Sequence, residues 1–175
     1  PLLISPHDSN VIYHGANVVL RSSFRGADWE IISPDLTTAD TDKFEGAGAV
    51  PFATTTTIDE SPMVAGLLWA GTDDGHVLVR RDPGADWQLH NANVPDNPGY
   101  WVSRIEASHH DAATAYLTYT GFHHDDMRPF VYKTTDYGQT WTSLSANLPQ
   151  RSVNVIVEDG KNPNLLFVGT DRGVY

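Results

Sequence analysis

Two short runs that predict turns each contain an aspartate that could act in acid–base catalysis. Asp73 lies in the run Thr72-Asp73-Asp74-Gly75, and Asp171 lies in the matching run Thr170-Asp171-Arg172-Gly173. Each run follows a short apolar stretch that predicts a β-strand, so each aspartate is expected in a hairpin turn. Two carboxylates roughly 5 to 10 Å apart can cleave a glycosidic bond, one as general acid and the other as base or nucleophile. Asp73 and Asp171 are therefore the candidate catalytic residues, and the alternative is that both only form turns.

A polar insertion is the second region with ligand-binding residue types. It contains the run His123-His124-Asp125-Asp126, where the other repeats of the chain have a tight turn. Imidazole and carboxylate groups bind divalent metal ions, but adjacent residues of a strand point to opposite faces. We therefore expect neither a metal site nor a cofactor. Asp125 or Asp126 is instead expected to bind a ligand together with Arg128, or to form an ion pair with it; a solvated loop is the alternative.

Aromatic residues flank this insertion. Tyr119 precedes it and Phe122 lies within it. Aromatic rings offer a large, flat apolar face to a ligand, so we expect both rings to be exposed and available to a sugar. For Trp101, packing between repeats and contact with a ligand are both open.

The composition of the chain excludes several kinds of partner. The 175 residues include 22 Asp and Glu but only 11 Lys and Arg, which gives a formal net charge of −11. This acidic balance argues against nucleic acids and anionic membrane surfaces. The chain has no cysteine, so disulfides and thiolate chemistry are excluded. No stretch approaches the roughly 20 apolar residues of a membrane helix, so no membrane insertion is expected.

A hairpin corner organises the elements that carry these residues. It is clearest in the run Thr134-Thr135-Asp136-Tyr137-Gly138-Gln139-Thr140-Trp141. Asp136 can accept hydrogen bonds from the N–H groups of the turn, and Gly138 can adopt a positive φ. Trp141 starts the next strand, where its ring can fill the gap between neighbouring units.

Two weaker copies of the corner occur earlier in the chain. The copy that ends at Trp87 keeps Asp82 and Gly84, whereas the copy that ends at Trp29 has Phe24 where the aspartate is expected. The tryptophans of successive corners are slightly more than 50 residues apart. Such a repeat length, with one hairpin signature in each unit, is typical of a four-stranded propeller blade.

The predicted fold class is all-β, a segment of a β-propeller with three blades and half of a fourth. Residues 1–175 are expected to be part of a single domain, with blades at about 1–44, 50–98 and 99–150 and a half blade at 151–175. No stretch has helical periodicity. Because a propeller closes with roughly four to eight blades, we expect the remainder of a longer chain, or further copies of this one, to complete the ring.

The corner from Thr134 to Trp141 resembles the Asp-box, or bacterial neuraminidase repeat, of the form S/T-x-D-x-G-x-T-W. Together with the runs 68–75, 101–109 and 166–175, it makes the chain similar to the sortilin N-terminal-like proteins, the bacterial glycosyl hydrolases with neuraminidase repeats. This resemblance implies a secreted bacterial protein in an extracellular or periplasmic location. It also implies that the corner residues are structural, namely Asp82, Gly84, Trp87, Asp136, Gly138 and Trp141.

Three functions are open at this point. The resemblance favours a non-catalytic module that binds a peptide or a polysaccharide at the propeller mouth. The turns at Asp73 and Asp171 resemble the Thr-Asp-x-Gly-Gly turn that supplies a catalytic carboxylate in two-propeller endo-glucanases that cleave xyloglucan, although His76 and Val174 replace the second glycine. This resemblance favours a glycoside hydrolase. A structural part of a surface assembly is the third function, whereas a sialidase is not expected because the arginines are scattered.

Overall fold

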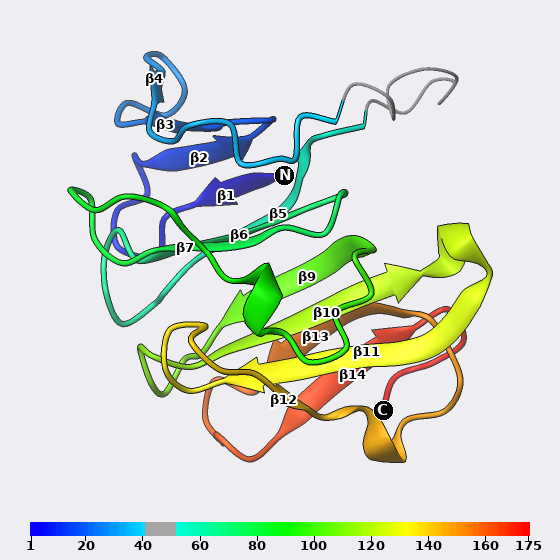
Figure 1. Ribbon diagram of the computed structural model, residues 1–175. Coiled ribbons are helices and arrows are strands. Elements are labelled where there is room, and N and C mark those ends of the chain that lie inside the picture. The colour runs from blue at the N-terminus through cyan, green and yellow to red at the C-terminus, as the bar shows by residue number, and fades with distance from the viewer. Residues whose placement is uncertain (41–51) are drawn as a thin grey trace.

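The computed structural model describes residues 1–40 and 52–175, which form four antiparallel sheets (Figure 1). Figure 1 shows the sheets stacked one on another, from the start of the chain at the top to its end at the bottom. Each of the first three sheets contains four strands in chain order, and the fourth contains two. The predicted fold class is therefore confirmed, with three four-stranded blades and half of a fourth.

Blade 1 consists of β1 (Leu2–Ile4), β2 (Ile12–Gly15), β3 (Val19–Ser22) and β4 (Glu30–Ile31). Blade 2 consists of β5 (Thr55–Glu60), β6 (Leu68–Thr72), β7 (Val77–Arg80) and β8 (Gln88–Leu89). Blade 3 consists of β9 (Trp101–Ala107), β10 (Ala115–Gly121), β11 (Asp126–Thr134) and β12 (Thr142–Ser143). The half blade consists of β13 (Val153–Glu158) and β14 (Leu166–Thr170). The limits predicted at residues 44 and 50 lie outside the described residues.

In the described part of the chain, single turns of 3-10 helix follow three of the strands. They are η2 (Asn91–Asn93), η3 (Phe122–His124) and η4 (Ser145–Asn147). Within residues 1–40 and 52–175, no helix has the length and apolar character needed to cross a membrane.

The hydrophobic core lies between neighbouring blades. Three clusters of buried side chains fill the three junctions. β6 contributes to two of them, because Leu68 packs with blade 1 and Trp69 packs with blade 3. Successive side chains of a strand point to opposite faces of the sheet, so a strand that is apolar at every position needs a neighbour on each side.

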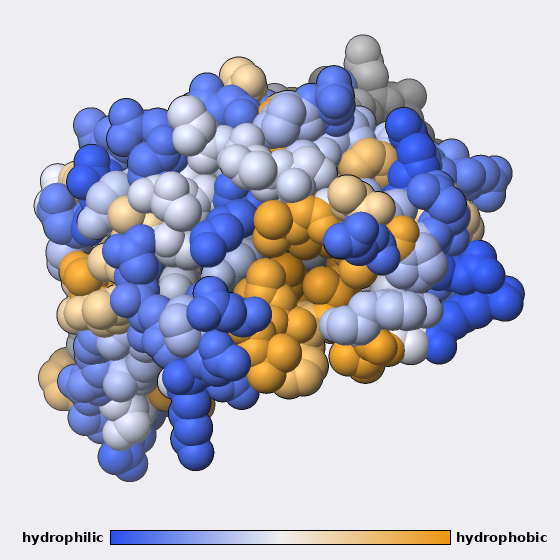
Figure 2. All heavy atoms as spheres, turned by 90° about the horizontal axis from the view of Figure 1, so that it is seen from below, coloured by the Kyte–Doolittle hydropathy of each residue, from blue (hydrophilic) through white to orange (hydrophobic). Residues whose placement is uncertain are grey.

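One face of the half blade is apolar and is not covered by another blade of the described chain. Figure 2, viewed from below, shows an apolar patch on this side of the molecule. Val155, Val157 and Phe167 are between 37% and 43% exposed there. Phe167 of β14 pairs with Val157, and Tyr116 of β10 pairs with Glu106. Phe167 therefore occupies the position in the half blade that Tyr116 occupies in blade 3.

Corner tryptophans pack against the preceding blade. The Nε1–H of Trp87 donates a hydrogen bond to the carbonyl oxygen of Ile32 in blade 1 (3.1 Å). Trp141 is only 6% exposed and meets Trp69 of blade 2 edge-to-face, with 6.1 Å between the ring centroids. Trp29, in the first blade, is 44% exposed. Each buried corner ring therefore closes one junction between blades.

The third corner is held by the carboxylate of Asp136. Its Oδ1 accepts hydrogen bonds from Thr134 Oγ1 and from the N–H of Thr140, both at 2.8 Å, and its Oδ2 accepts one from Thr140 Oγ1 at 2.7 Å. Gly138 has φ +86°, a left-handed conformation that glycine adopts without steric cost. One ionised side chain thus joins both arms of the turn through charge-assisted hydrogen bonds.

The first two corners reach a similar shape with different residues. In the first corner, Asp28 supplies the carboxylate that Phe24 cannot supply, and its Oδ1 accepts hydrogen bonds from Ser22 Oγ (2.9 Å) and from the N–H of Phe24 (3.1 Å). In the second corner, the carboxylate of Asp82 accepts one hydrogen bond, from the N–H of Gly84 (2.9 Å). The carboxylate can therefore enter the turn from either arm.

Asp136→Ala is expected to lower the free energy of unfolding by about 1–3 kcal/mol, because the three donors of the third corner lose their ionised acceptor. Asp82→Ala is the matched control, and with one hydrogen bond lost it should cost about 0.5–1 kcal/mol. Urea unfolding at neutral pH measures both values. An equal loss in the two variants would show that the hydrogen bonds of Asp136 do not stabilise the fold.

Candidate functional site

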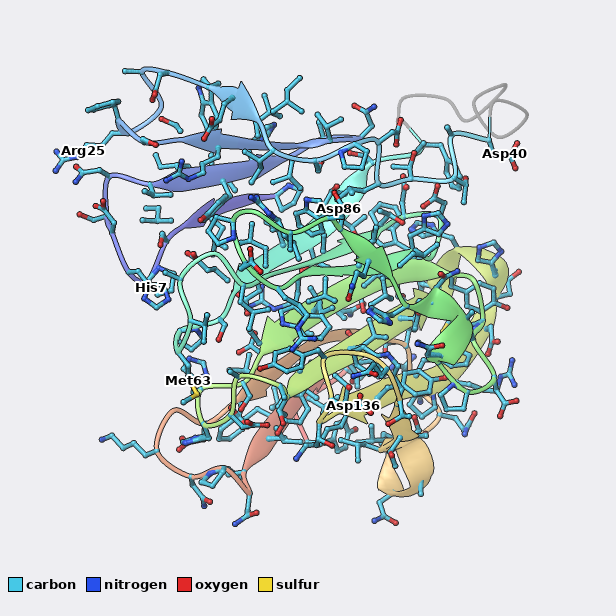
Figure 3. The ribbon with its side chains drawn as sticks, turned by 60° about the vertical axis from the view of Figure 1, so that its left-hand side comes forward. His7, Arg25, Asp40, Met63, Asp86 and Asp136 are labelled. Carbon is cyan, nitrogen blue, oxygen red and sulfur yellow. The ribbon has the colours of Figure 1, made fainter. Side chains whose placement is uncertain are left out.

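The residues predicted to act on a ligand gather at one end of the blades. The turn between β6 and β7, the insertion between β10 and β11, and the turn after β14 each follow the second strand of a blade. We call this end, with residues 73–76, 122–125 and 171–173, the hairpin end. The first two of these turns lie on the right of Figure 1, and the corners of blades 2 and 3 lie on the left. Figure 3 labels one residue in each corner: Arg25 lies at the upper left, and Asp86 lies above Asp136 nearer the centre of the view.

Asp73 is a buried carboxylate at the hairpin end. Asp73 is 5% exposed, and its Oδ1 accepts a hydrogen bond from the N–H of Thr54 (2.9 Å). Its Oδ2 is buried and has no hydrogen-bond partner among the described residues. Burial, and then the charge of Asp74, raises the pKa of Asp73 above its ordinary value. A carboxyl group with a raised pKa is suited to hold a proton and act as a general acid.

Its neighbour Asp74 is used to fix the turn. Asp74 Oδ2 accepts hydrogen bonds from the N–H (2.6 Å) and from the Oγ1 (2.7 Å) of Thr38, and Asp74 Oδ1 accepts one from Thr72 Oγ1. These bonds tie the β6–β7 turn to the segment that follows blade 1. Asp74 is therefore engaged in structure, while Asp73 keeps one oxygen free of a described partner.

Asp171 has a different environment from Asp73. It is exposed, and its Oδ2 lies 3.8 Å from Nε of the adjacent Arg172. The two aspartates belong to blade 2 and to the half blade, with blade 3 between them. Among the described residues, no hydrogen bond or ion pair joins them, and the structure does not bring them together as a contacting pair.

The insertion carries a cluster of stacked rings, which we call the aromatic shelf; its members are Tyr100, Trp101, Phe122, His123 and His124. His124 stacks on Tyr100 with 4.5 Å between centroids and 11° between planes, and His123 stacks on Trp101 at 5.5 Å and 22°. Phe122 meets the edge of His123 at 5.6 Å. Phe122 itself is 56% exposed. The shelf thus presents an apolar ring to solvent and supports it from behind.

The charged residues of the insertion form an ion pair beside the shelf. Arg128 Nη2 lies 2.6 Å from Asp126 Oδ2, and Arg128 Nε lies 3.0 Å from Asp126 Oδ1. The hydrogen bonds from Arg128 lower the pKa of Asp126 to about 2. Asp125 has φ +54° and follows η3, where its N–H donates to the carbonyl oxygen of Phe122 (3.4 Å). The sequence leaves ligand binding and ion pairing open for these residues, and the structure shows the ion pair.

The expectation that Tyr119 is exposed is wrong. Its relative exposure is 0%, and its ring meets Tyr132 edge-to-face at 6.1 Å. Tyr119 belongs to the core cluster between blades 2 and 3, because neighbouring blades cover both faces of β10. Trp101 is half-buried and stacks on His123. Among residues 1–40 and 52–175, no three His, Asp or Glu side chains are placed to share a metal ion.

Two tyrosine–glutamate hydrogen bonds between blades were missed in the sequence. Tyr13 donates to Glu60 Oε1 (3.1 Å) between blades 1 and 2, and Tyr116 donates to Glu158 Oε1 (2.8 Å) between blade 3 and the half blade. Burial, and then the charge of Glu60, raises the pKa of Tyr13 to about 12. A signal was present, because each glutamate ends the inner strand of its sheet and each tyrosine lies near the start of a second strand.

No protein-family model and no curated protein matches this sequence. Solved structures do resemble it. An ancestral GH74 enzyme has a TM-score of 0.70 and 16% identity over 100% of this chain and 22% of its own. The GH74 xyloglucanase from Xanthomonas campestris has a TM-score of 0.66 and 15% identity, over 99% of this chain and 28% of its own. YCF48 bound to D1 peptide has a TM-score of 0.58 and 12% identity, over 95% of this chain and 45% of its own.

These likenesses show the fold alone, which is that of a β-propeller. The chain spans between 22% and 45% of the length of the three similar structures. Which residues of the hairpin end act on a ligand is therefore a matter for proposal and experiment.

The raised pKa of Asp73 predicts a pH-dependent effect of Asp73→Asn. Because the folded pKa lies above the ordinary 3.8, the stability that Asp73 contributes is fully present below pH 3.8 and is lost as the pH rises through the folded pKa. Asparagine does not titrate, so the variant should gain stability relative to the original chain between about pH 3 and pH 7. Urea unfolding across this range checks the sign, and a difference that does not change with pH would contradict the raised pKa.

Proposed function

We propose that this chain is part of a propeller module that binds a polysaccharide at its hairpin end. The observation that carries the proposal is the aromatic shelf, in which the exposed ring of Phe122 is backed by His123 on Trp101. The apolar face of a sugar ring fits against such a ring, and its hydroxyl groups can exchange hydrogen bonds with the neighbouring Asp126 and Arg128.

The charges near the shelf favour a neutral polymer. Asp126 and Arg128 neutralise each other in a close pair, so the pair offers donors and acceptors without a net charge. The whole chain carries a net charge of −11, which disfavours strongly anionic polymers. The similarity to a GH74 xyloglucanase supports xyloglucan as the first polysaccharide to test.

A peptide is the other ligand considered from the sequence, and the similarity to YCF48 bound to D1 peptide supports it. The shelf favours the sugar, because it exposes the flat apolar ring of Phe122 to solvent. In a peptide complex, main-chain hydrogen bonds to a sheet edge are a common source of affinity. Binding assays with both ligand classes separate the two.

The proposal includes the wider setting of the chain. Residues 1–175 are taken as part of a single propeller domain, with blades at about 1–44, 50–98 and 99–150, a half blade at 151–175, and further chain or further copies completing the ring. The bonds around Asp136 support an Asp-box of the sortilin and neuraminidase-repeat kind, with Asp82, Gly84, Trp87, Gly138 and Trp141 in structural roles. An extracellular or periplasmic location is part of the same proposal.

A glycoside hydrolase is the second candidate, and one observation favours it. Asp73 is buried, has a raised pKa and keeps an oxygen without a described partner. In this function Asp73 donates a proton to the leaving oxygen of the glycosidic bond, and a second carboxylate, with Asp171 as the candidate, acts as base or nucleophile.

Phe122→Ala is expected to weaken the binding of xyloglucan by about 3- to 10-fold, because the exposed ring of the shelf is lost. Leu89→Ala is the matched control, since Leu89 is a 50% exposed apolar residue on the outer strand β8. Isothermal titration calorimetry measures both affinities. Equal affinities of the two variants, or binding of peptides with no binding of any polysaccharide, would sink the proposal.

A reducing-sugar assay on xyloglucan tests the second candidate separately. If the chain hydrolyses the polymer, Asp73→Asn should lower the turnover number by about 10²- to 10⁴-fold, as expected for loss of a general acid. Turnover that survives in Asp73→Asn removes the proposed role of this residue. An absence of turnover with intact binding leaves the binding module as the function.

A further inference from the structure

A cavity lies away from the hairpin end, between blades 1 and 2. Its volume is about 500 Å³, and its lining includes His7, Tyr13, Glu60, Ala65 and Arg80. It lies at the end of the blades that carries the corners, beside the β1–β2 and β5–β6 turns. Figure 3 shows the turns that carry His7 and Met63 on the same side of the molecule. His7 Nε2 and the carbonyl oxygen of Ser61, 2.8 Å apart, join these two turns.

Glu60 is one of the lining residues, and one of its carboxylate oxygens has no hydrogen-bond partner among the described residues. The residue is 3% exposed, and its Oε1 accepts hydrogen bonds from Tyr13 OH (3.1 Å) and from the N–H of Gly66 (2.7 Å). Its Oε2 is buried and has no hydrogen-bond partner among the described residues. A buried acceptor without a donor is costly, and it is more costly when it is charged.

The half blade contains a matched glutamate that has no such deficit. Glu158 pairs with Leu166 as Glu60 pairs with Leu68, so the two glutamates occupy the same register position. Glu158 Oε1 accepts from Tyr116 OH (2.8 Å), and Glu158 Oε2 accepts from Ser108 Oγ (2.8 Å) and from the N–H of His109 (2.6 Å). Both of its oxygens are therefore satisfied within the protein.

A proline accounts for one of the two donors that reach Glu158 Oε2 but have no counterpart at Glu60 Oε2. The turn Ser108-His109-His110-Asp111, which faces Glu158, corresponds to Ser5-Pro6-His7-Asp8, which faces Glu60. The third residue of each turn is a histidine, His110 in one and His7 in the other. In both turns the Nε2 atom of this histidine lies 2.8 Å from a carbonyl oxygen of the next blade. Pro6 occupies the position of His109 and has no backbone N–H to donate. The backbone donor of this turn is therefore absent because of the sequence, whereas Ser5 keeps the hydroxyl that Ser108 has.

The nearby cations are already engaged elsewhere. Arg21 Nη1 lies 2.9 Å from Glu30 Oε1. Arg80 donates to the carbonyl oxygens of Asp82 and Pro83. Among the described residues, no lysine or arginine forms an ion pair with Glu60. The cavity therefore contains a buried carboxylate that lacks a cationic partner.

We propose that the cavity between blades 1 and 2 binds a small molecule with a primary ammonium group, which donates to Glu60 Oε2. The volume of about 500 Å³ falls in the range of roughly 300–1,000 Å³ that small-molecule sites occupy. An ammonium group supplies the donor that Pro6 withholds and the positive charge that the arginines do not supply. This site lies at the other end of the blades from the polysaccharide site, so it stands or falls independently of that proposal.

Glucosamine and glucose test this site as a matched pair, because they share a ring and differ at one position in carrying an amine or a hydroxyl group. At about pH 6.5 an amine with a pKa near 8 is protonated. Glucosamine is expected to bind about 10- to 100-fold more tightly than glucose, the worth of a hydrogen bond to a charged group. The shift of the Gly66 amide in ¹⁵N NMR reports binding directly, because this N–H donates to Glu60 Oε1.

Glu60→Gln is expected to remove the preference for glucosamine, and Glu158→Gln is expected to keep it. Ala65→Trp, a change at an exposed residue of the lining, should block glucosamine without altering Glu60, and it keeps the test valid if Glu60→Gln fails to fold. Phe122→Ala should leave glucosamine binding unchanged. Equal binding of the two sugars, no binding of glucosamine, a preference that survives in Glu60→Gln, or a loss in Phe122→Ala would each overturn the proposal.

Discussion

A sheet with apolar side chains on both faces needs a neighbouring sheet on each side, and the rest of the structure depends on that constraint. β6 is buried at every residue and sends side chains into two clusters. Hydrogen bonds between side chains also join neighbouring blades, and they differ from one junction to the next. Tyr13 with Glu60, and Tyr116 with Glu158, join the outer two junctions. At the middle junction Trp69 and Ala107 occupy the corresponding positions. At the middle junction the tyrosine hydroxyl and the glutamate carboxylate are thus both absent, and the indole N–H of Trp69 is buried without a partner among the described residues.

The two ends of the blades carry different kinds of loop, although the core reaches both of them through Trp141 of the third corner and Tyr100 of the aromatic shelf. At the hairpin end, the β6–β7 connection is a tight turn, while the β10–β11 connection is lengthened by η3 and carries the aromatic shelf. At the corner end, the carboxylates of Asp28 and Asp136 close turns, and Trp87 and Trp141 pack on the preceding blade. The stacked aromatic rings thus lie on loops at one end of the blades, while the corners that join neighbouring blades lie at the other.

The sequence predicts the parts of this structure that are written locally. The Gly-to-Trp corners and their spacing predict the all-β class, the blades and the half blade, because turn chemistry and strand alternation act over a few residues. Tyr119 shows the limit, since its exposure depends on a blade that lies outside its own hairpin. Phe24 shows a second limit of prediction from sequence. It stands where an aspartate is expected, but Asp28, on the other arm of the turn, supplies the carboxylate that accepts the hydrogen bonds. The unsatisfied oxygen of Glu60 needs a comparison between two turns, Ser5–Asp8 and Ser108–Asp111, that only the register of the strands makes equivalent.

A core that lies between units rather than inside them gives the fold the character of a nearest-neighbour chain, in which each blade is stabilised mainly by the two beside it. Damage to one sheet then uncovers the adjacent sheets as well. Substitutions in β6, which serves two interfaces through Leu68 and Trp69, carry this double penalty, whereas the short outer strands β4, β8 and β12 carry little of it. The sequence of such a protein is therefore expected to change most slowly in strands that serve two interfaces, such as β6, and fastest in the short outer strands.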